Sequence, residues 1–202
     1  MRFRHPQAAE GRFDEAIAQV RGAVEFDPLS IRYSSALGVI YYYARRYEES
    51  VRQYRAALEL NPNDVFVHEG LADTYEQQGL HRETVAEWCA ALKLDGDSRI
   101  AAIVDRAYAS GGFRAATRAM ARKKLEQLAG WTNRGVLVPA VEYARAHLRL
   151  GQREQALEWL AKACDERTIF VLFINVDPFY DELRVDPRFQ ELVKRIQVPV
   201  RN

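Results

Sequence analysis

The chain has 202 residues, of which 48% are hydrophobic and 28% are charged, and its formal net charge is +1. These values are ordinary for a globular domain, and no apolar run approaches the roughly 20 residues that a membrane-spanning helix needs. The first residues are basic but no apolar stretch follows them, so we expect no signal peptide, no membrane contact and a cytoplasmic location.

The small net charge hides a change of sign along the chain. Residues 47–97 carry four basic and eleven acidic side chains, a net charge of −7, whereas residues 99–153 carry eleven basic and three acidic side chains, a net charge of +8. Charge asymmetry of this kind indicates a charged partner.

A small residue recurs every 34 residues, at Ala23, Ala57 and Ala91, as expected where two packed helices approach closely. Further sets of positions keep the same step: Phe26, Leu60 and Leu94; Pro28, Pro62 and Gly96; Ala16, Ser50 and Thr84; and Gly11, Arg45 and Gly79. A period of this length predicts stacked helix hairpins, each of which buries its apolar face against its neighbours.

We expect the first hairpin, about residues 1–30, to be incomplete through truncation, a wrongly assigned start or an interface with another copy, because a full repeat ending there would begin before Met1. We expect its second helix at about residues 13–26 and only a stub of its first helix, near Pro6. The apolar face that this leaves uncovered predicts self-association as a homodimer.

Two complete hairpins follow, at residues 31–64 and 65–97. Pro62 ends the first of them, because proline lacks a backbone N–H and clashes with the preceding turn. A turn through Gly96 takes that place in the second.

The fourth unit, residues 98–130, is degenerate. We expect a break at Gly111-Gly112 and a long second helix, at about residues 113–129, that Gly130 ends. The pattern recovers in a fifth unit at residues 137–168.

The remaining segment, residues 169–202, is not a repeat. An apolar run leads to Asp177-Pro178 and then Asp186-Pro187, and each pair predicts an N-cap followed by proline at the first helical position. We expect capping helices that close the open end of the array, as stacked repeats require, with a final apolar face formed by Phe189, Leu192, Val193 and Ile196.

These repeats resemble the tetratricopeptide family, in which units 31–64, 65–97 and 137–168 fit well and the other two fit in part. The resemblance implies an all-α, right-handed superhelix of antiparallel helix hairpins with C-terminal capping helices. In the family, the first helices line a concave groove that binds peptides or extended protein segments. The resemblance therefore implies a non-enzymatic scaffold for protein–protein interaction.

The segment from Ala144 to Pro199 is also similar to the C-terminal arrays of large bacterial regulators, in which such repeats follow a kinase, a winged-helix domain or a cyclase. This likeness implies a second hypothesis, that the chain is the sensing or docking tail of a longer bacterial regulator.

The family register places twelve side chains on the groove, and their order is aromatic, then acidic, then basic. A partner with the complementary order of charges would gain orientation and association rate; the alternative is a set of solvated helix faces. The residues are Arg32, Val39, Tyr42 and Tyr43, then Phe66, Glu69, Asp73 and Glu76, then Arg99, Arg106, Arg145 and Arg149.

One specialisation of the family does not fit. Arrays that grip the C-terminal carboxylate of chaperones use a clamp of Lys, Asn and Arg side chains. Of the matching positions only Arg99 is basic, and the others include Ser35, Ala36, Val39 and Ile103.

No motif predicts catalysis, a metal site or a cofactor. The histidines are scattered, and neither a nucleophile elbow nor a phosphate loop is present. Gly111-Gly112 has no preceding strand and predicts an inter-helix turn rather than an anion site. Cys89 and Cys164 predict reduced, buried thiols. The histidines are His5, His68, His81 and His147.

A third hypothesis is nucleic-acid binding through the basic segment 99–153, because phosphate affinity rests on Lys and Arg. Arg114, Arg118 and Arg122 recur every four residues there. No aromatic residues interleave with them for stacking, and they fall on a second helix, so the sequence favours a solvated convex face.

Overall fold

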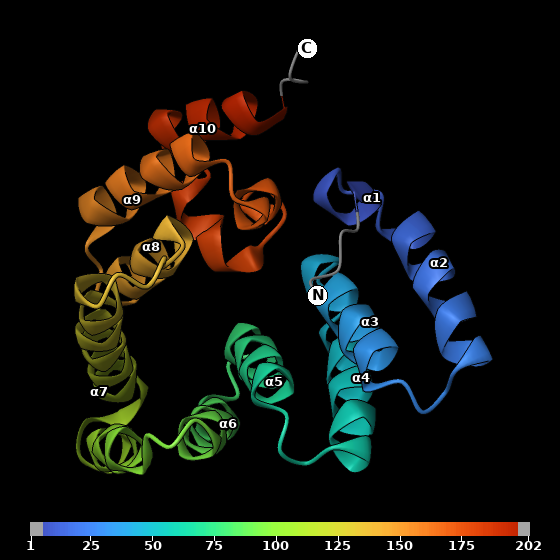
Figure 1. Ribbon diagram of the computed structural model, residues 1–202, viewed down its shortest axis with the longest axis horizontal. Coiled ribbons are helices and arrows are strands. Elements are labelled where there is room, and N and C mark those ends of the chain that lie inside the picture. The colour runs from blue at the N-terminus through green and yellow to red at the C-terminus, as the bar shows by residue number, and fades with distance from the viewer. Residues whose placement is uncertain (1–5, 198–202) are drawn as a thin grey trace.

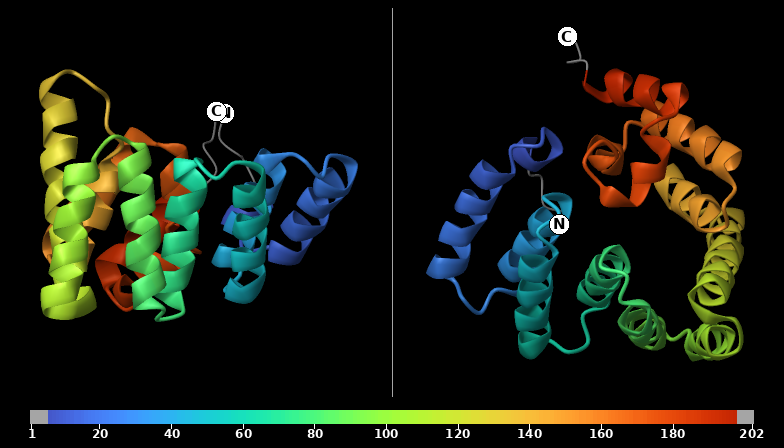
Figure 2. Two further views of the ribbon diagram at one scale, coloured as in Figure 1. Left: turned by 90° about the horizontal axis from the view of Figure 1, so that it is seen from below. Right: turned by 180° about the vertical axis from the view of Figure 1, so that it is seen from behind.

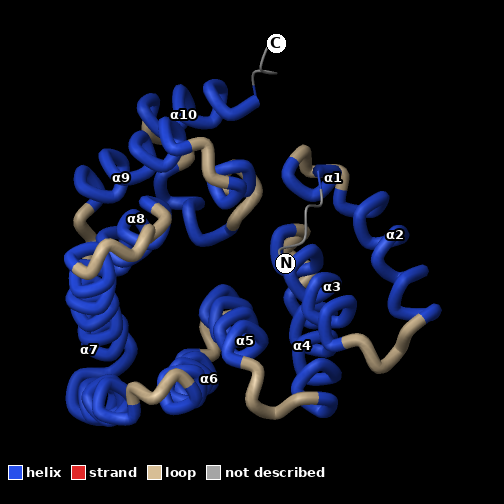
Figure 3. The backbone as a smooth tube through the Cα atoms, in the orientation of Figure 1, coloured by secondary structure: helices blue, strands red, loops and turns tan. Residues whose placement is uncertain are grey.

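The computed structural model describes residues 6–197, and every regular element in this range is a helix (Figure 3). Consecutive helices pack as hairpins that follow one another around an arc, with the first and last helices on opposite sides of its concave face (Figure 1). This confirms the predicted all-α superhelix. The elements are α1 (Pro6–Ala9), α2 (Phe13–Phe26), α3 (Ile31–Tyr43), α4 (Tyr47–Leu60), α5 (Val65–Gln77), α6 (His81–Leu94), α7 (Ser98–Asn133), α8 (Ala140–Arg149), α9 (Arg153–Glu166), the 3₁₀ helices η1 (Ile169–Phe173) and η2 (Pro178–Leu183), and α10 (Pro187–Gln197).

The 34-residue period recurs in the contacts between helices. Arg21 of α2 donates to the hydroxyl of Tyr41 on α3 at 2.6 Å, and Arg55 of α4 donates to the hydroxyl of Tyr75 on α5 at 2.8 Å. In both pairs the guanidinium carbon lies 5.9 Å from the ring centroid. The second helix of one repeat is thus joined in the same way to the first helix of the next repeat.

Tyr54 fills the space between the first helices of two successive repeats. The side chain is 2% exposed, and a Cβ atom added at Gly38 or Gly70 would come within 2.9 or 2.5 Å of it. Ser50, also buried, donates to the carbonyl of Gly38 at 2.8 Å. Both first helices therefore need glycine where they meet the tyrosine ring.

The fourth unit departs from the pattern at Gly112, whose φ of 68° is not helical. This is the predicted interruption, and it divides α7 into two arms. The second arm continues through Gly130 to Asn133, so the prediction that Gly130 ends the helix was wrong. A glycine inside a helix costs only about 1 kcal/mol, and the helix around it is anchored by Leu128, which is fully buried.

The C-terminal segment turns back into the concave side of the arc (Figure 2). There η1 and η2 lie between α8 and the N-terminal helices, and η1 contacts α1. Asp177 caps η2 by accepting a hydrogen bond from the Phe179 amide, and Asp186 accepts one from the Arg188 amide at the start of α10. Both Asp-Pro pairs therefore act as predicted. Helix α10 packs on α9 at the end of the array, whereas the return of the preceding segment into the groove was not predicted.

We predict that Gly70→Ala destabilises the protein by about 1–3 kcal/mol, because the new methyl group overlaps the buried ring of Tyr54. Gly22→Ala is the matched control: this glycine lies within α2 and has open space around it, so the change should stabilise by up to about 1 kcal/mol. Urea denaturation measures both. Equal effects of the two substitutions would contradict the close packing described for Tyr54.

Candidate functional site

A cavity of about 300 Å³ lies at the centre of the concave side. The first helices α3, α5 and α8 line it together with the second arm of α7, and the two 3₁₀ helices of the C-terminal segment close one side. Its walls combine aromatic rings with charged side chains. This composition makes it the candidate site, because binding pockets pair apolar walls with a few placed polar groups.

Eight of the predicted groove residues line this cavity: Val39, Tyr42, Tyr43, Phe66, Glu69, Asp73, Arg145 and Arg149. Glu76 lies beside them and pairs with Arg149. Arg32, Arg99 and Arg106 are exposed and lie outside the cavity lining. Arg99 and Arg106 stand on the first arm of α7, and after the break at Gly112 the second arm, with Lys124, faces the cavity instead. The peptide-binding role of the twelve residues stays a prediction.

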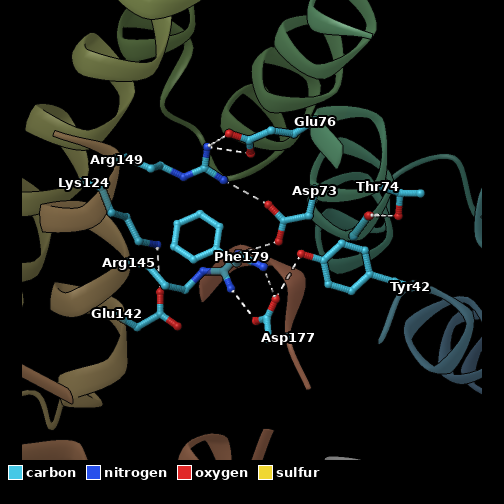
Figure 4. Close-up of polar contacts among 11 residues, drawn as sticks. Tyr42, Asp73, Thr74, Glu76, Lys124, Glu142, Arg145, Arg149, Asp177 and Phe179 are labelled. Carbon is cyan, nitrogen blue, oxygen red and sulfur yellow. Dashed lines mark hydrogen bonds and ion pairs between the residues drawn. The ribbon is translucent and has the colours of Figure 1, made fainter. Parts of the chain in front are cut away.

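Arg145 is the centre of a partly buried ion network that crosses the cavity (Figure 4). Its guanidinium donates to Asp73 of α5 at 2.6 Å and to Asp177 of the C-terminal segment at 3.0 Å. Arg145 also lies 4.1 Å from the centroid of the Phe179 ring. Two carboxylates from distant parts of the chain are therefore held by one cation.

Arg149 extends the network by one helical turn. It donates to Asp73 at 3.0 Å and to Glu76 at 2.9 Å. Its guanidinium lies 4.7 Å from the Trp88 ring and 5.0 Å from the Phe179 ring. The basic side chains of the fifth unit are thus neutralised by the acidic side chains of the third.

Burial disfavours every charge in this network, and the pairing opposes it. Burial raises the pKa of Asp177, and Arg145 lowers it in part. Glu76 behaves alike, since burial raises its pKa and Arg149 lowers it. For Arg145, burial works to lower the pKa, but Asp73 and Asp177 outweigh burial and hold the pKa well above its usual range.

The C-terminal segment is also fastened to α3 and to the turn that follows it. The Tyr42 hydroxyl donates to Asp177 at 3.0 Å. Arg45 forms two hydrogen bonds with Asp181, at 2.6 and 2.7 Å. The rings of Tyr43 and Phe173 stack with centroids 5.2 Å apart. These contacts join the second repeat to the end of the chain and close the arc.

Several cavity residues escaped the sequence analysis. Lys124 lies on a helix that was expected to face outward, and Glu142 stands one turn before Arg145 on the helix that was expected to face the groove. Asp177 and Tyr180 belong to a segment that was expected only to cap the array. The change of charge sign near residue 98 was a signal for the acidic–basic pairing, but it was interpreted as a property of the partner.

The other candidate side chains have structural partners. His68 contacts Glu87 and the carbonyl of Pro62, and His81 stacks on Phe113. His5 lies outside the described residues. Within residues 6–197 no group of three or more metal-type ligands comes together, and none of these helices is both long and apolar enough to cross a membrane.

Comparison with known proteins gives one family. Residues 38–79, from the middle of α3 to the turn after α5, match a family model described as TPR repeat. This range contains the glycine–tyrosine packing around Tyr54. No curated protein matches the chain.

We predict that Tyr42→Phe destabilises the protein by about 1.5–3 kcal/mol, because it removes a hydrogen bond to the buried carboxylate of Asp177. Tyr43→Phe is the control, since the Tyr43 hydroxyl makes no hydrogen bond with a described residue, and its effect should be within about 0.5 kcal/mol. Denaturant titration compares the two neighbours. Equal losses would show that the hydrogen bond to Asp177 contributes little.

The pH dependence of stability tests the contact between Arg45 and Asp181. Burial works to raise the pKa of Asp181, but hydrogen bonds from Arg45 and Arg184 outweigh burial and hold it below 3.8. Its contribution to the free energy of unfolding is therefore complete above that pH and is lost as the pH falls through the depressed pKa.

The stability difference between the wild type and Asp181→Asn should accordingly be largest near neutral pH and shrink below pH 3.8. Glu182→Gln is the control, because Glu182 is exposed and has no ion-pair partner among the described residues. Thermal unfolding across the pH range measures both. A difference for Asp181→Asn that is independent of pH would contradict the role given to this ion pair.

Proposed function

We propose that this tetratricopeptide-repeat protein is a non-enzymatic, cytoplasmic scaffold that binds an extended segment of another protein on its concave side. The observation that supports this most is the central cavity, which keeps aromatic and acidic side chains accessible within a rigid array of repeats. Phe66 is 55% exposed at this cavity. An exposed aromatic ring in a concave site is a typical anchor for a partner side chain.

The ion network limits the part of the cavity in which a partner can bind. Arg145 and Arg149 already have carboxylate and aromatic partners, so they are poor contacts for an acidic peptide. The accessible part of the cavity instead holds Phe66, Glu69 and Glu142. The partner segment therefore contacts the N-terminal halves of α5 and α8, where these residues lie.

Two further candidates rest on the outer surface. Arg114, Arg118 and Arg122 are exposed and form no ion pair within the described residues, which favours a contact with an anionic partner such as nucleic acid. If the protein binds neither DNA nor RNA even at low ionic strength, this candidate is removed.

The second candidate is self-association of the first repeat, which the exposure of Phe26 (91%) and Leu29 (76%) favours. Light scattering that shows a monomer would remove this second candidate.

The cavity proposal is tested with a random peptide library selected on the immobilised protein, followed by affinity measurements on the enriched peptides. Phe66→Ala should weaken their binding by about tenfold or more, because truncating an anchoring aromatic residue costs more than 1 kcal/mol. Phe26→Ala removes an even more exposed ring outside the cavity and should leave the affinity unchanged. Failure to enrich any peptide, or equal losses for both variants, would overturn the proposal.

A further inference from the structure

Helices α5 and α8 face each other across the cavity with their charged side chains in matching order. Glu76 pairs with Arg149, and one turn earlier Asp73 pairs with Arg145. The spacing along both helices continues to a third level, where the residues are Glu69 on α5 and Glu142 on α8. Two levels of this ladder therefore carry opposite charges, and the third carries two carboxylates.

The third level lacks a full complement of positive charge. The Nζ atom of Lys124, from the second arm of α7, lies 3.9 Å from a carboxylate oxygen of Glu142. This ion pair is drawn in Figure 4. Glu69 forms no ion pair with any residue of the described chain. Glu69 is exposed at the cavity. Partial desolvation nevertheless raises its pKa, and Asp73 and Glu142 raise it further against the opposing effect of Lys124. The third level thus carries two carboxylates and a single ammonium group, which pairs with Glu142 alone.

The paired levels show which cation this environment suits. Arg145 lies between two carboxylates and the Phe179 ring, and Arg149 lies between two carboxylates and the Trp88 ring. A guanidinium group fits such a site because it is planar, stacks on aromatic rings and donates several hydrogen bonds in one plane. The third level has the same components without the guanidinium, since Phe66 stands three residues before Glu69 on α5 and lines the same cavity.

A second, independent feature points to a missing donor in this cavity. Tyr180 lines it from the C-terminal segment and is 1% exposed. Its hydroxyl group is buried near the Arg145 guanidinium, but it makes no hydrogen bond of regular geometry in the part of the chain that the structure describes. A buried hydroxyl without a partner costs free energy, and an N–H group entering the cavity would provide one.

We propose that an arginine side chain of the protein partner completes the third level of the ladder, with its guanidinium between Glu69 and Glu142, its face toward Phe66, and Tyr180 as a further acceptor. This inference rests on the proposed function, because it names the side chain that the partner segment inserts. A lysine would supply the charge but neither the planar stacking nor the paired hydrogen bonds.

The test uses N-acetyl-arginine methylamide as the probe. The probe is added to the full chain up to tens of millimolar, and NMR chemical shifts of the protein report binding. We expect shifts at residues of the cavity. The matched probe N-acetyl-citrulline methylamide has nearly the same shape without the charge and should leave them unchanged. Glu69→Gln should weaken binding of the arginine probe by about tenfold, whereas Glu83→Gln, an exposed residue of α6, should not.

Lys124 gives a sharper test, because it competes for the same carboxylates. Lys124→Ala should strengthen binding of the arginine probe by about threefold, as expected for the loss of one partly exposed ion pair. Lys123→Ala makes the same change of net charge next to it, where the side chain pairs with Glu126 on the outer face, and should have no effect. Equal effects of the two variants would show attraction by net charge alone and overturn the proposal.

The outcomes for this inference and for the proposed function are distinguishable. If library peptides bind in a manner that depends on Phe66 but tolerate replacement of their arginines by citrulline, the scaffold function stands and the arginine site is overturned. If the arginine probe shifts no cavity residue, the site is likewise overturned, whatever the peptides do. If the probe binds at Glu69 and Glu142 but no peptide is enriched, the site stands and the scaffold function fails.

Discussion

The burial of Asp177 is the constraint on which the arrangement of this protein depends. A carboxylate taken out of water has to be paired and hydrogen-bonded, and its partners come from three places: Tyr42 in the second repeat, Arg145 in the fifth, and the amide of Phe179 beside it. Satisfying that one charge brings the C-terminal segment into the concave side. It also fixes the distance between repeats that are far apart in the chain, which an open array of hairpins would leave adjustable.

The reversal of charge along the sequence has its explanation in the same network. Taken alone, an acidic segment followed by a basic one indicates a partner of complementary charge. In the folded chain the curvature of the array brings Asp73 and Glu76 opposite Arg145 and Arg149, and the two segments complement each other. Composition reports only the sign of a segment, and the fold decides whether its complement is another molecule or a later repeat. What remains unmatched within the cavity is an excess of negative charge at Glu69 and Glu142, beside Lys124.

The parts of the structure that could be predicted from the sequence are those that local forces determine. Helix α2 follows from its apolar spacing, the C-terminal end of α4 follows from Pro62, and the two Asp-Pro pairs act as caps in short segments. The position of the C-terminal segment could not be predicted from the sequence. It depends on the hydrogen bond between Tyr42 and Asp177, which are 135 residues apart, and no periodic pattern encodes such a contact. The outward placement expected for Lys124 failed for a related reason: the break at Gly112 was recognised, but not that the arm after it turns toward the cavity.

Departures from the repeat were nevertheless visible, and Arg45 shows how they can be used. It occupies the turn where the repeats before and after have Gly11 and Gly79, and all three residues have a positive φ. For a residue with a side chain this conformation costs about 1 kcal/mol. Arg45 donates two hydrogen bonds to Asp181 in return, a contact that glycine cannot make. A strained residue that interrupts a periodic glycine therefore marks a position where the repeat serves a contact beyond its own hairpin, and here that contact closes the arc around the cavity.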